Sequence, residues 1–356
     1  MRIAFFGSSL VSAYWNGAAT YYRGLIRALH TLGHDVTFYE PDAFERQQHR
    51  DIDDPPWARV VVYQSHEGMA RALDEARRAD VIVKASGVGV FDRELEEAVL
   101  DRPSTTLAVF WDVDAPATLD RLDGDPGDPF HALVPQYDGV FTYGGGDPVR
   151  RAYLAAGARM CEPIYNALDP STHFPVPPEP RFACDLAFLG NRLPDREARV
   201  DDFFLDAARR LPDRSFVIGG AGWSDKPMPS NVRHAGHVYT ADHNAFNCTP
   251  LAVLNVSRDS MARYGFSPAT RVFEAAGAGA CVVTDAWEGI EMFYEPGREI
   301  LVAHDGSEVA SHLAALTPAC ARAIGNAAMA RTLASHTYAG RAAQVSAVLQ
   351  GRAVAA

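Results

Sequence analysis

Short apolar runs alternate with segments of helical spacing along most of the chain. Residues 1–6 form an apolar run, residues 17–32 repeat leucine at helical intervals, and residues 36–39 form a second apolar run. A strand, a helix and a strand in this order predict one unit of a wound parallel sheet. The same pattern predicts further strands at residues 81–84, 105–111, 139–143, 161–165, 185–189, 215–218, 238–240, 251–255, 280–284 and 300–302. It predicts further helices near residues 67–78, 93–100, 149–156, 200–211, 285–291, 309–316 and 341–349.

The alternation stops near the middle of the chain. Residues 169–182 are rich in proline and lack periodicity, which is typical of a linker. A chain of 356 residues suits two domains of ordinary size. We therefore predict an α/β protein with two Rossmann-like, doubly wound domains. The predicted parts are an N-terminal domain (1–166), a linker (167–183), a C-terminal domain (184–335) and a C-terminal helix (336–356).

Residues 263–284 carry the most informative pattern, a glycine-containing loop, a short helix, a tight turn and a buried strand. Ser267 is a plausible N-cap, and Pro268 would then be the first helical residue. A helix N-terminus behind such a loop can hold a phosphate. Arg271 and Glu274 lie three residues apart, so both side chains can point toward a ligand. The alternative is an ion pair between these two side chains on the helix surface.

The run RVFEAAGAGACVVTDAWEGIEMFYEPGREILVAHD resembles the C-terminal half of glycosyltransferases of the GT-B fold, and most closely the CgeB-like family (glycosyltransferase group 1). The resemblance rests on Arg271, Glu274, Gly277, Thr284, Asp285 and Glu299, which follow the family's order. It implies two Rossmann-like domains facing across a cleft, and transfer of a sugar from a nucleotide-diphosphate-sugar donor to an acceptor hydroxyl. One departure is clear: many relatives carry an acidic residue in an E-G-F-G loop, whereas residues 264–267 read YGFS.

The resemblance assigns the donor mainly to the C-terminal domain. It implies that Glu274 holds the ribose hydroxyls and that Arg271 or Arg192 neutralises the departing diphosphate. The C-terminal helix commonly crosses back to the first domain in this fold. The candidate donor-binding residues are Gly190, Asn191, Arg192, Arg196, Gly222, Trp223, Asn255, Arg258, Gly265, Phe266, Ser267, Thr270 and Glu274, with Arg271 as a catalytic residue.

The acceptor is assigned to the N-terminal domain. The loop GSSLVSAYWNGAATYYRG follows the first strand, at the sheet edge where doubly wound folds bind ligands. Its aromatic and hydroxyl groups suit a sugar, although a packed surface loop is the alternative. The candidate acceptor-binding residues are Ser8, Ser9, Tyr14, Trp15, Asn16, Thr20 and Asp114.

Two aspartates follow the nearly continuous apolar strand at residues 105–111. If the reaction inverts the anomeric centre, one of them could take the acceptor hydroxyl's proton; if it retains the centre, they could only orient the acceptor. Asp114 precedes Ala115 and Pro116 and so resembles a helix cap. Asp112 is therefore the first choice as a catalytic residue, and a turn with a capping aspartate is the alternative.

The composition mainly disfavours certain partners and types of site. The formal charge of −12 disfavours polymeric nucleic acid as a partner, and the only lysines are Lys84 and Lys226. Five scattered cysteines indicate neither disulfides nor a zinc site, and the histidines lack metal-ligand spacing. We expect no metal and no cofactor besides the nucleotide-diphosphate-sugar co-substrate. The absence of a long apolar run and of a leader predicts a cytoplasmic protein without a transmembrane segment.

Two other functions fit the same fold. One is a non-catalytic nucleotide-sugar-binding or structural protein, because a fold does not certify chemistry. The other is a nucleotide-sugar epimerase, which would convert the donor without an acceptor. The sequence does not indicate the base or the sugar of the donor. It also does not indicate the acceptor, the stereochemistry of transfer or the oligomeric state.

Overall fold

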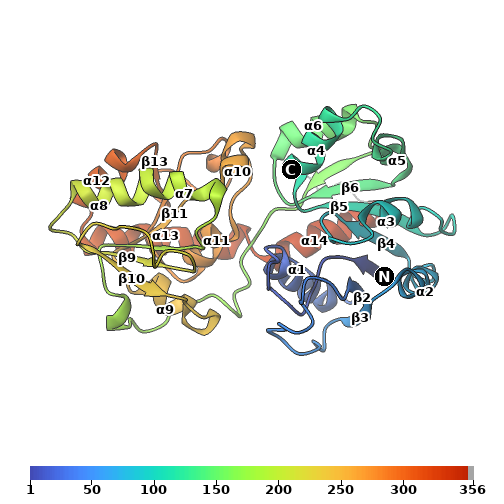
Figure 1. Cartoon of the computed structure of the whole chain (residues 1–356), viewed down its shortest axis with the longest axis horizontal. Helices are drawn as coiled ribbons and strands as arrows, with labels where there is room; N and C mark the ends of the chain where they lie inside the picture. Colours follow the sequence, from blue (N-terminus) through green and yellow to red (C-terminus); the bar gives the residue numbers. More distant parts are fainter. Residues whose placement is uncertain (352–356) are drawn as a thin grey trace. The chain divides into compact units, whose positions relative to one another are not determined.

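The computed structural model describes residues 1–351, except the side chains of Asp195 and Ser260. The chain divides into two compact units, each with its own sheet (Figure 1). Unit 1 contains Met1–Tyr165 and the helix that starts at Tyr338, and unit 2 is Asn166–Thr337.

Unit 1 is built on a seven-stranded sheet in which every neighbouring pair is parallel. Its strands are β1 (Arg2–Phe6), β2 (Asp35–Pro41), β3 (Arg59–Tyr63), β4 (Val81–Ala85), β5 (Leu107–Asp112), β6 (Gly139–Thr142) and β7 (Cys161–Pro163), in the order β3-β2-β1-β4-β5-β6-β7. Its helices are α1 (Ala19–Thr31), α2 (His66–Ala76), α3 (Asp92–Ala98), α4 (Ala115–Gly124), α5 (Phe130–Leu133), η1 (Val134–Gln136), α6 (Gly146–Ala155) and α14 (Tyr338–Leu349). Sequence order reverses at β1, so the loops after β1 and β4 meet at the switch point where such sheets bind ligands.

Burial on both faces explains why the central strands are continuous apolar runs. All five residues of β4 are buried, including Lys84. Its ammonium group donates to Asp92 at 2.8 Å, so the buried charge is paired. Helix α14 packs on α1 of the same unit, where a side-chain carbon at Gly24 would lie 2.2 Å from the ring of Tyr338. Gly24 is therefore required for this helix contact.

Unit 2 repeats the same topology with one strand fewer, and its strand pairs are also parallel. Its strands are β8 (Leu186–Leu189), β9 (Phe216–Gly219), β10 (Val232–Gly236), β11 (Ala252–Asn255), β12 (Val282–Asp285) and β13 (Leu301–Ala303), in the order β10-β9-β8-β11-β12-β13. Its helices are η2 (Pro180–Phe182), α7 (Pro194–Val200), the π-helical η3 (Asp201–Leu205), α8 (Asp206–Arg210), η4 (Thr240–Asp242), α9 (His243–Cys248), α10 (Asp259–Tyr264), α11 (Thr270–Gly277), η5 (Ile290–Met292), α12 (Gly306–Ala315) and α13 (Pro318–Ser335). The switch point here lies between β8 and β11.

Several predicted elements were wrong. Residues 238–240 are not a strand, and in place of the helix predicted at 285–291 a loop follows the last strand residue, Asp285, and leads into the single turn η5. The edge strands β3 and β10 and the long helix α13 were not predicted. Strand β10 (VRHAG) is mostly polar or small and gives no apolar signal, whereas β3 (RVVVY) has an apolar run that the prediction missed. Helix α13 is rich in alanine, and its small side chains give almost no apolar periodicity.

Candidate functional site

Helix α11 begins later than predicted. It spans Thr270–Gly277 with Ala269 as its N-cap residue, so Ser267 is not the N-cap and Pro268 is not the first helical residue. The reason is local: Ala269 has extended backbone angles, and the Pro268 carbonyl accepts a hydrogen bond from the side-chain amide of Asn166 at 3.2 Å. The Thr270 hydroxyl donates to the same Asn166 side chain at 3.0 Å. Asn166 therefore fixes the entry of α11.

The start of α11 is open to an anion. Within residues 1–351, no described side chain caps its N-terminus. The Val272 N–H donates to the Ala269 carbonyl at 3.0 Å, which leaves the N–H groups of Thr270 and Arg271 and the positive end of the helix dipole available. Arg271 is the second helical residue. The helix supplies positive potential from both its backbone and its side chain.

Arg271 and Glu274 do not form the predicted alternative, an ion pair on an open surface. Among the described residues, no ion pair within 4.0 Å joins them, and Arg271 is only partly exposed. Burial lowers the pKa of the Arg271 guanidinium to about 10, against the opposing effect of Glu274. The nearby charge of Arg196 lowers the Arg271 pKa further. An arginine whose charge is opposed by burial and by a second arginine is suited to a ligand with negative charge.

Two histidines, which the sequence analysis did not select, lie beside Glu274. Nε2 of His173 lies 3.9 Å from a carboxylate oxygen of Glu274, whose side chain is 18% exposed. The ring of His243 lies 6.4 Å from the ring of His173, centre to centre, at the start of α9. Burial lowers the pKa of His243, an effect opposed by Glu274 and reinforced by Arg271. His243 is therefore neutral at pH 7. No spacing in the sequence links these residues, because three separate segments contribute them.

The loop after β8 approaches Arg196. A side-chain carbon at Gly190 would lie 3.0 Å from Nη1 of Arg196 and 2.9 Å from the Phe188 ring. At Gly220 (φ +118°) it would lie 2.3 Å from the Gly190 carbonyl oxygen. Glycine at both positions lets the loops after β8 and β9 pack backbone to backbone. The amide of Asn191 holds this contact by accepting from the N–H of Ala221 at 3.0 Å.

Two predicted donor residues have structural roles here. Trp223 is 1% exposed, packs edge-on against Phe188 and donates its indole N–H to the Gly190 carbonyl at 2.6 Å. We therefore correct its assignment as a ligand contact: Trp223 belongs to the core. Arg192 bonds Glu197 at 2.7 Å, Asp225 at 3.1 Å and the Gly222 carbonyl at 3.3 Å. Its charge is largely compensated, unlike that of Arg271.

The remaining predicted donor residues surround the carboxyl ends of β11 and β12. Asn255 is buried and donates its amide to the Thr284 hydroxyl at 3.0 Å. Arg258 is the exposed N-cap residue of α10. Gly265 (φ +67°) and Phe266 (φ +45°) are left-handed, and the Phe266 N–H donates to the Glu288 carbonyl. This strained pair turns the chain from α10 toward α11.

A buried ion pair holds the loop after β11. The carboxylate of Asp285 is fully buried and accepts from Arg199 at 2.6 Å and from the N–H of Ser257 at 3.1 Å. Burial raises the pKa of Asp285, while Arg199 and Ser257 oppose the change. Asp285 thus connects the end of β12 to the loop after β11.

In unit 1 the structure contradicts the catalytic assignment of Asp112. Its side chain is 0% exposed, at the end of β5. One carboxylate oxygen accepts from Ser86 at 2.7 Å, Thr118 at 3.1 Å and the Asp114 N–H at 3.0 Å. The other accepts from the Tyr153 hydroxyl. A general base must reach the proton that it takes, so this enclosed carboxylate is a structural group. Asp114 is exposed and occupies the predicted N-cap position of α4.

The loop after β1 separates into a buried framework and an exposed edge. Ser8, Ser9 and Asn16 are buried and bonded within the protein: Ser8 donates to Asn16 at 2.9 Å and Ser9 to the buried Glu40 at 2.9 Å. These three residues cannot contact a ligand directly, which corrects their assignment. The exposed members of the predicted set are Tyr14, Trp15 and Thr20.

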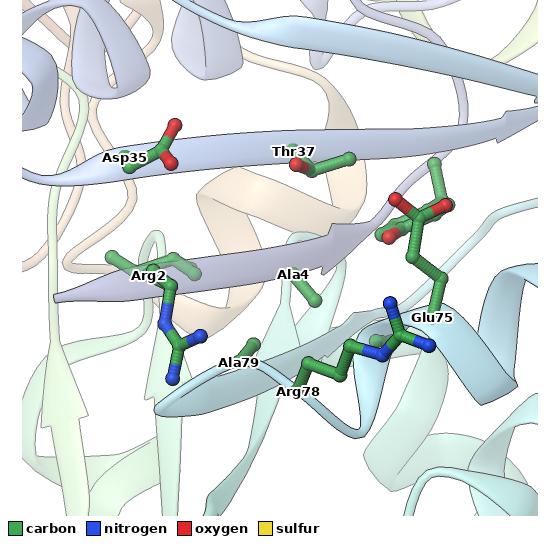
Figure 2. A pocket seen from close by; sticks show the side chains of 10 residues that line it. Arg2, Ala4, Asp35, Thr37, Glu75, Arg78 and Ala79 are labelled. Atoms are coloured by element: carbon green, nitrogen blue, oxygen red, sulfur yellow. The ribbon is translucent and has the colours of Figure 1, made fainter.

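A small pocket lies at the opposite, amino edge of the same sheet. It measures about 150 Å³, and Figure 2 shows Arg2 and Asp35 at one end and Glu75 and Arg78 at the other. Arg2 is paired with Asp80 at 3.1 Å. Ligands of parallel sheets bind at the carboxyl edge, so this pocket does not belong to the candidate site. Among the described residues, no helix has the length and apolarity to cross a membrane.

Solved structures that are similar to this chain have the GT-B fold. They include Anabaena Alr3699/HepE in complex with UDP and glucose (15% identity, TM-score 0.68, covering 99% of this chain and 100% of that chain). Sucrose-phosphate synthase from Thermosynechococcus elongatus has 16% identity, a TM-score of 0.67 and coverage of 99% and 98%. An alpha-glucosyltransferase in complex with UDP and a 13-mer DNA has 11% identity, a TM-score of 0.68 and coverage of 98% and 99%. The predicted fold class, GT-B with two Rossmann-like domains, is confirmed.

A match at the level of sequence covers part of the chain. Residues 196–347 match the family described as "Glycosyl transferase-like". This range includes α11 and the whole group of Arg271, Glu274 and His243. Among curated proteins, no sequence matches the chain.

Proposed function

We propose that the protein is a glycosyltransferase that moves a sugar from a nucleotide-diphosphate-sugar donor to an acceptor hydroxyl, and that unit 2 binds the donor. The observation that carries this proposal is the position of Arg271 in the first turn of the uncapped helix α11, one helical turn before Glu274, without an ion pair between the two side chains among the described residues. Positive charge for a diphosphate and a carboxylate for a ribose diol are thereby placed on one short helix. Assignment to the CgeB-like group is part of the same proposal.

Each group has a chemical task in this scheme. As the bond from the anomeric carbon to the diphosphate breaks, negative charge grows on the leaving oxygen. Arg271, Arg196 and the N–H groups of α11 stabilise that charge without having to reorganise. The Glu274 carboxylate accepts hydrogen bonds from the ribose hydroxyls. His243, held neutral by burial, can donate one ring N–H and accept at the other nitrogen.

The acceptor oxygen forms the new bond to the anomeric carbon as the bond from that carbon to the diphosphate breaks, and the acceptor's proton is released together with the nucleoside diphosphate. Asp112 cannot receive this proton, because its four hydrogen bonds enclose it. Asp114 is the exposed aspartate at the same strand end. We propose that Asp114 contacts the acceptor, and that arginine charge replaces a divalent metal at the diphosphate.

The similarities support this proposal. Alr3699/HepE was solved with UDP-glucose and with UDP and glucose, and the alpha-glucosyltransferase with UDP. These proteins share only the fold with this chain, at 11–16% identity. UDP and UDP-hexoses are therefore the first probes, and the donor base is settled by comparing UDP with GDP, ADP and dTDP.

Calorimetric titration of the full chain with UDP, followed by hydrolysis of UDP-hexoses, tests the proposal. We expect Glu274→Gln and Arg271→Met each to weaken UDP binding about tenfold or more, since each removes a charge-assisted hydrogen bond of about 1.5–3 kcal/mol. The matched controls are the exposed Glu97→Gln and Arg210→Met, which should bind as the wild type does. Turnover should persist in EDTA.

The other outcomes are equally informative. Failure of all four nucleoside diphosphates to bind, or binding unchanged in both site variants, would contradict the proposal. Binding without turnover of any donor would indicate a binding protein. Conversion of a donor to an isomeric sugar nucleotide without an acceptor would indicate an epimerase.

A further inference from the structure

Backbone strain in unit 1 is concentrated at one edge of its sheet. Within residues 1–351, five non-glycine residues have a left-handed backbone, and four of them are Trp15, Phe44, Glu45 and Phe91. These four follow β1, β2 and β4, which are neighbours in the sheet and parallel, so their carboxyl ends share one edge. Left-handed bulky residues are unfavourable and cluster at functional sites.

The side chains at this edge are aromatic and exposed. Trp15 is 76% exposed, Phe44 53% and Tyr14 37%. The Tyr14 ring stacks on His49 at 4.0 Å and meets the Trp15 ring edge-on at 6.3 Å. We call Tyr14, Trp15 and Phe44 the aromatic edge. Folding does not explain its exposure, because burial of these rings would be favourable.

A buried arginine holds the aromatic edge in place. Arg46 is 6% exposed and donates to the main-chain carbonyls of Ser8 at 3.3 Å, Val88 at 3.4 Å and Trp15 at 3.3 Å. Its guanidinium also lies 5.0 Å from the centre of the Phe44 ring. The loops after β1, β2 and β4 are therefore joined through one side chain at the switch point. Trp15 is presented by a rigid framework, which reduces the entropy lost on binding.

The surrounding charges restrict the ligand. Residues 42–54 contain five acidic residues, of which Asp51 pairs with Arg23 and Asp54 with Arg50. Since Arg46 is buried on main-chain carbonyls, these three arginines are all engaged within the protein, and this edge does not favour phosphate-rich polymers or anionic lipid surfaces. Aromatic rings with polar neighbours suit a neutral molecule that has an apolar face and many hydroxyls. A pyranose ring has both properties.

We propose that the aromatic edge binds the acceptor, and that the acceptor is a neutral carbohydrate whose sugar ring stacks on Trp15. That the bound carbohydrate is the acceptor of the reaction rests on the proposed function. That the aromatic edge binds a carbohydrate does not depend on the proposed function. The Thr20 hydroxyl is exposed on α1, which starts after the same loop. It is the first candidate for a hydrogen bond to the bound sugar.

An array of neutral oligosaccharides (gluco-, galacto-, manno- and chito-oligosaccharides), probed with the full chain, tests this proposal. The main variant is Trp15→Asn, because asparagine tolerates a left-handed backbone and the fold should be kept. We expect the wild type to bind at least one of these glycans and Trp15→Asn to bind it at least tenfold more weakly. The control Tyr239→Ala removes a 67% exposed aromatic ring of unit 2 and should leave glycan binding within twofold.

Stability and donor measurements separate the possible failures. Trp15→Asn should unfold at a midpoint equal to or above that of the wild type, because it relieves strain while removing a ring that the fold does not bury. Donor hydrolysis by the wild type without an acceptor reports on the proposed function alone. The proposal is overturned by binding to none of the glycans, by equal binding of the wild type and Trp15→Asn, or by Trp15-dependent binding to phosphatidylcholine vesicles.

Discussion

Replacing Asp112 by asparagine distinguishes a structural carboxylate from a catalytic one. In the folded protein the two carboxylate oxygens accept from Ser86, Thr118, the Asp114 N–H and Tyr153. An asparagine oxygen can keep the first three of these bonds. Its amide group then faces the Tyr153 hydroxyl, which must change from donor to acceptor.

The expected loss of stability follows from the number of hydrogen bonds that change. One rearranged, buried hydrogen bond to a charged group corresponds to about 1.5–3 kcal/mol in the free energy of unfolding. For a unit of this size that is a decrease of roughly 3–12 °C in the unfolding midpoint of unit 1. Asp112→Ala leaves three hydroxyl donors without an acceptor at about 1–3 kcal/mol each. A loss of that size is a large part of the roughly 5–15 kcal/mol that stabilises a domain.

The assay measures stability and turnover on the same preparations. Urea unfolding, followed by hydrogen exchange at β5, should show the loss of stability in Asp112→Asn, and the exposed Asp123→Asn should match the wild type. Turnover per folded molecule should change less than about threefold below the unfolding transition, whereas loss of a general base costs about 10²–10⁴-fold. Unchanged stability together with a hundredfold loss of turnover would refute the structural role.

Two further predictions concern unit 2. The side chains of Arg192 and Lys226 lower the pKa of Glu197 from 4.5 to about 2, so its contribution to stability is complete above pH 4.5 and is lost as the pH falls through about 2. Acid titration of the unfolding midpoint should be less steep in Glu197→Gln between these pH values, most visibly at low salt; equal slopes would contradict the assignment. Gly220→Ala should destabilise the chain by roughly 2–4 kcal/mol through its left-handed backbone and the clash with the Gly190 carbonyl. The control Gly236→Ala, which is left-handed but meets no atom within 4 Å, should lose only about 1 kcal/mol by thermal unfolding.

The fold was predictable because the strands at the centre of each sheet are buried on both faces. Strands β4 (VIVKA) and β5 (LAVFWD) therefore appear as mainly apolar runs. The edge strand β10 (VRHAG) and the alanine-rich α13 lack this signal. The start of α11 was misplaced for a different reason. Ser267 and Pro268 have the local chemistry of a helix start, but a hydrogen bond from Asn166, about a hundred residues earlier in the chain, keeps Pro268 outside the helix.

The candidate site was predictable where chemistry follows local spacing and not where it depends on burial. Arg271 and Glu274 share a helix, so their proximity follows from three-residue spacing. His173 and His243 come from separate segments and meet only in the fold. The sequence places Asp112, Ser8 and Ser9 at the correct sheet edge. It does not show that their polar atoms are already hydrogen-bonded to other side chains of the protein. Position at a strand end indicates where a ligand binds, and exposure decides which residue can contact it.

The two units show how one topology can support two kinds of binding. Both sheets reverse their order beside the first strand, so each presents two loops at a switch point. In unit 2 those loops and α11 gather arginine, histidine and glutamate around an open helix end. In unit 1 the corresponding loops expose aromatic rings, and their one shared arginine is buried and used for support. Under the proposed function, unit 2 would hold the charged diphosphate of the donor, and unit 1 would hold a neutral carbohydrate acceptor.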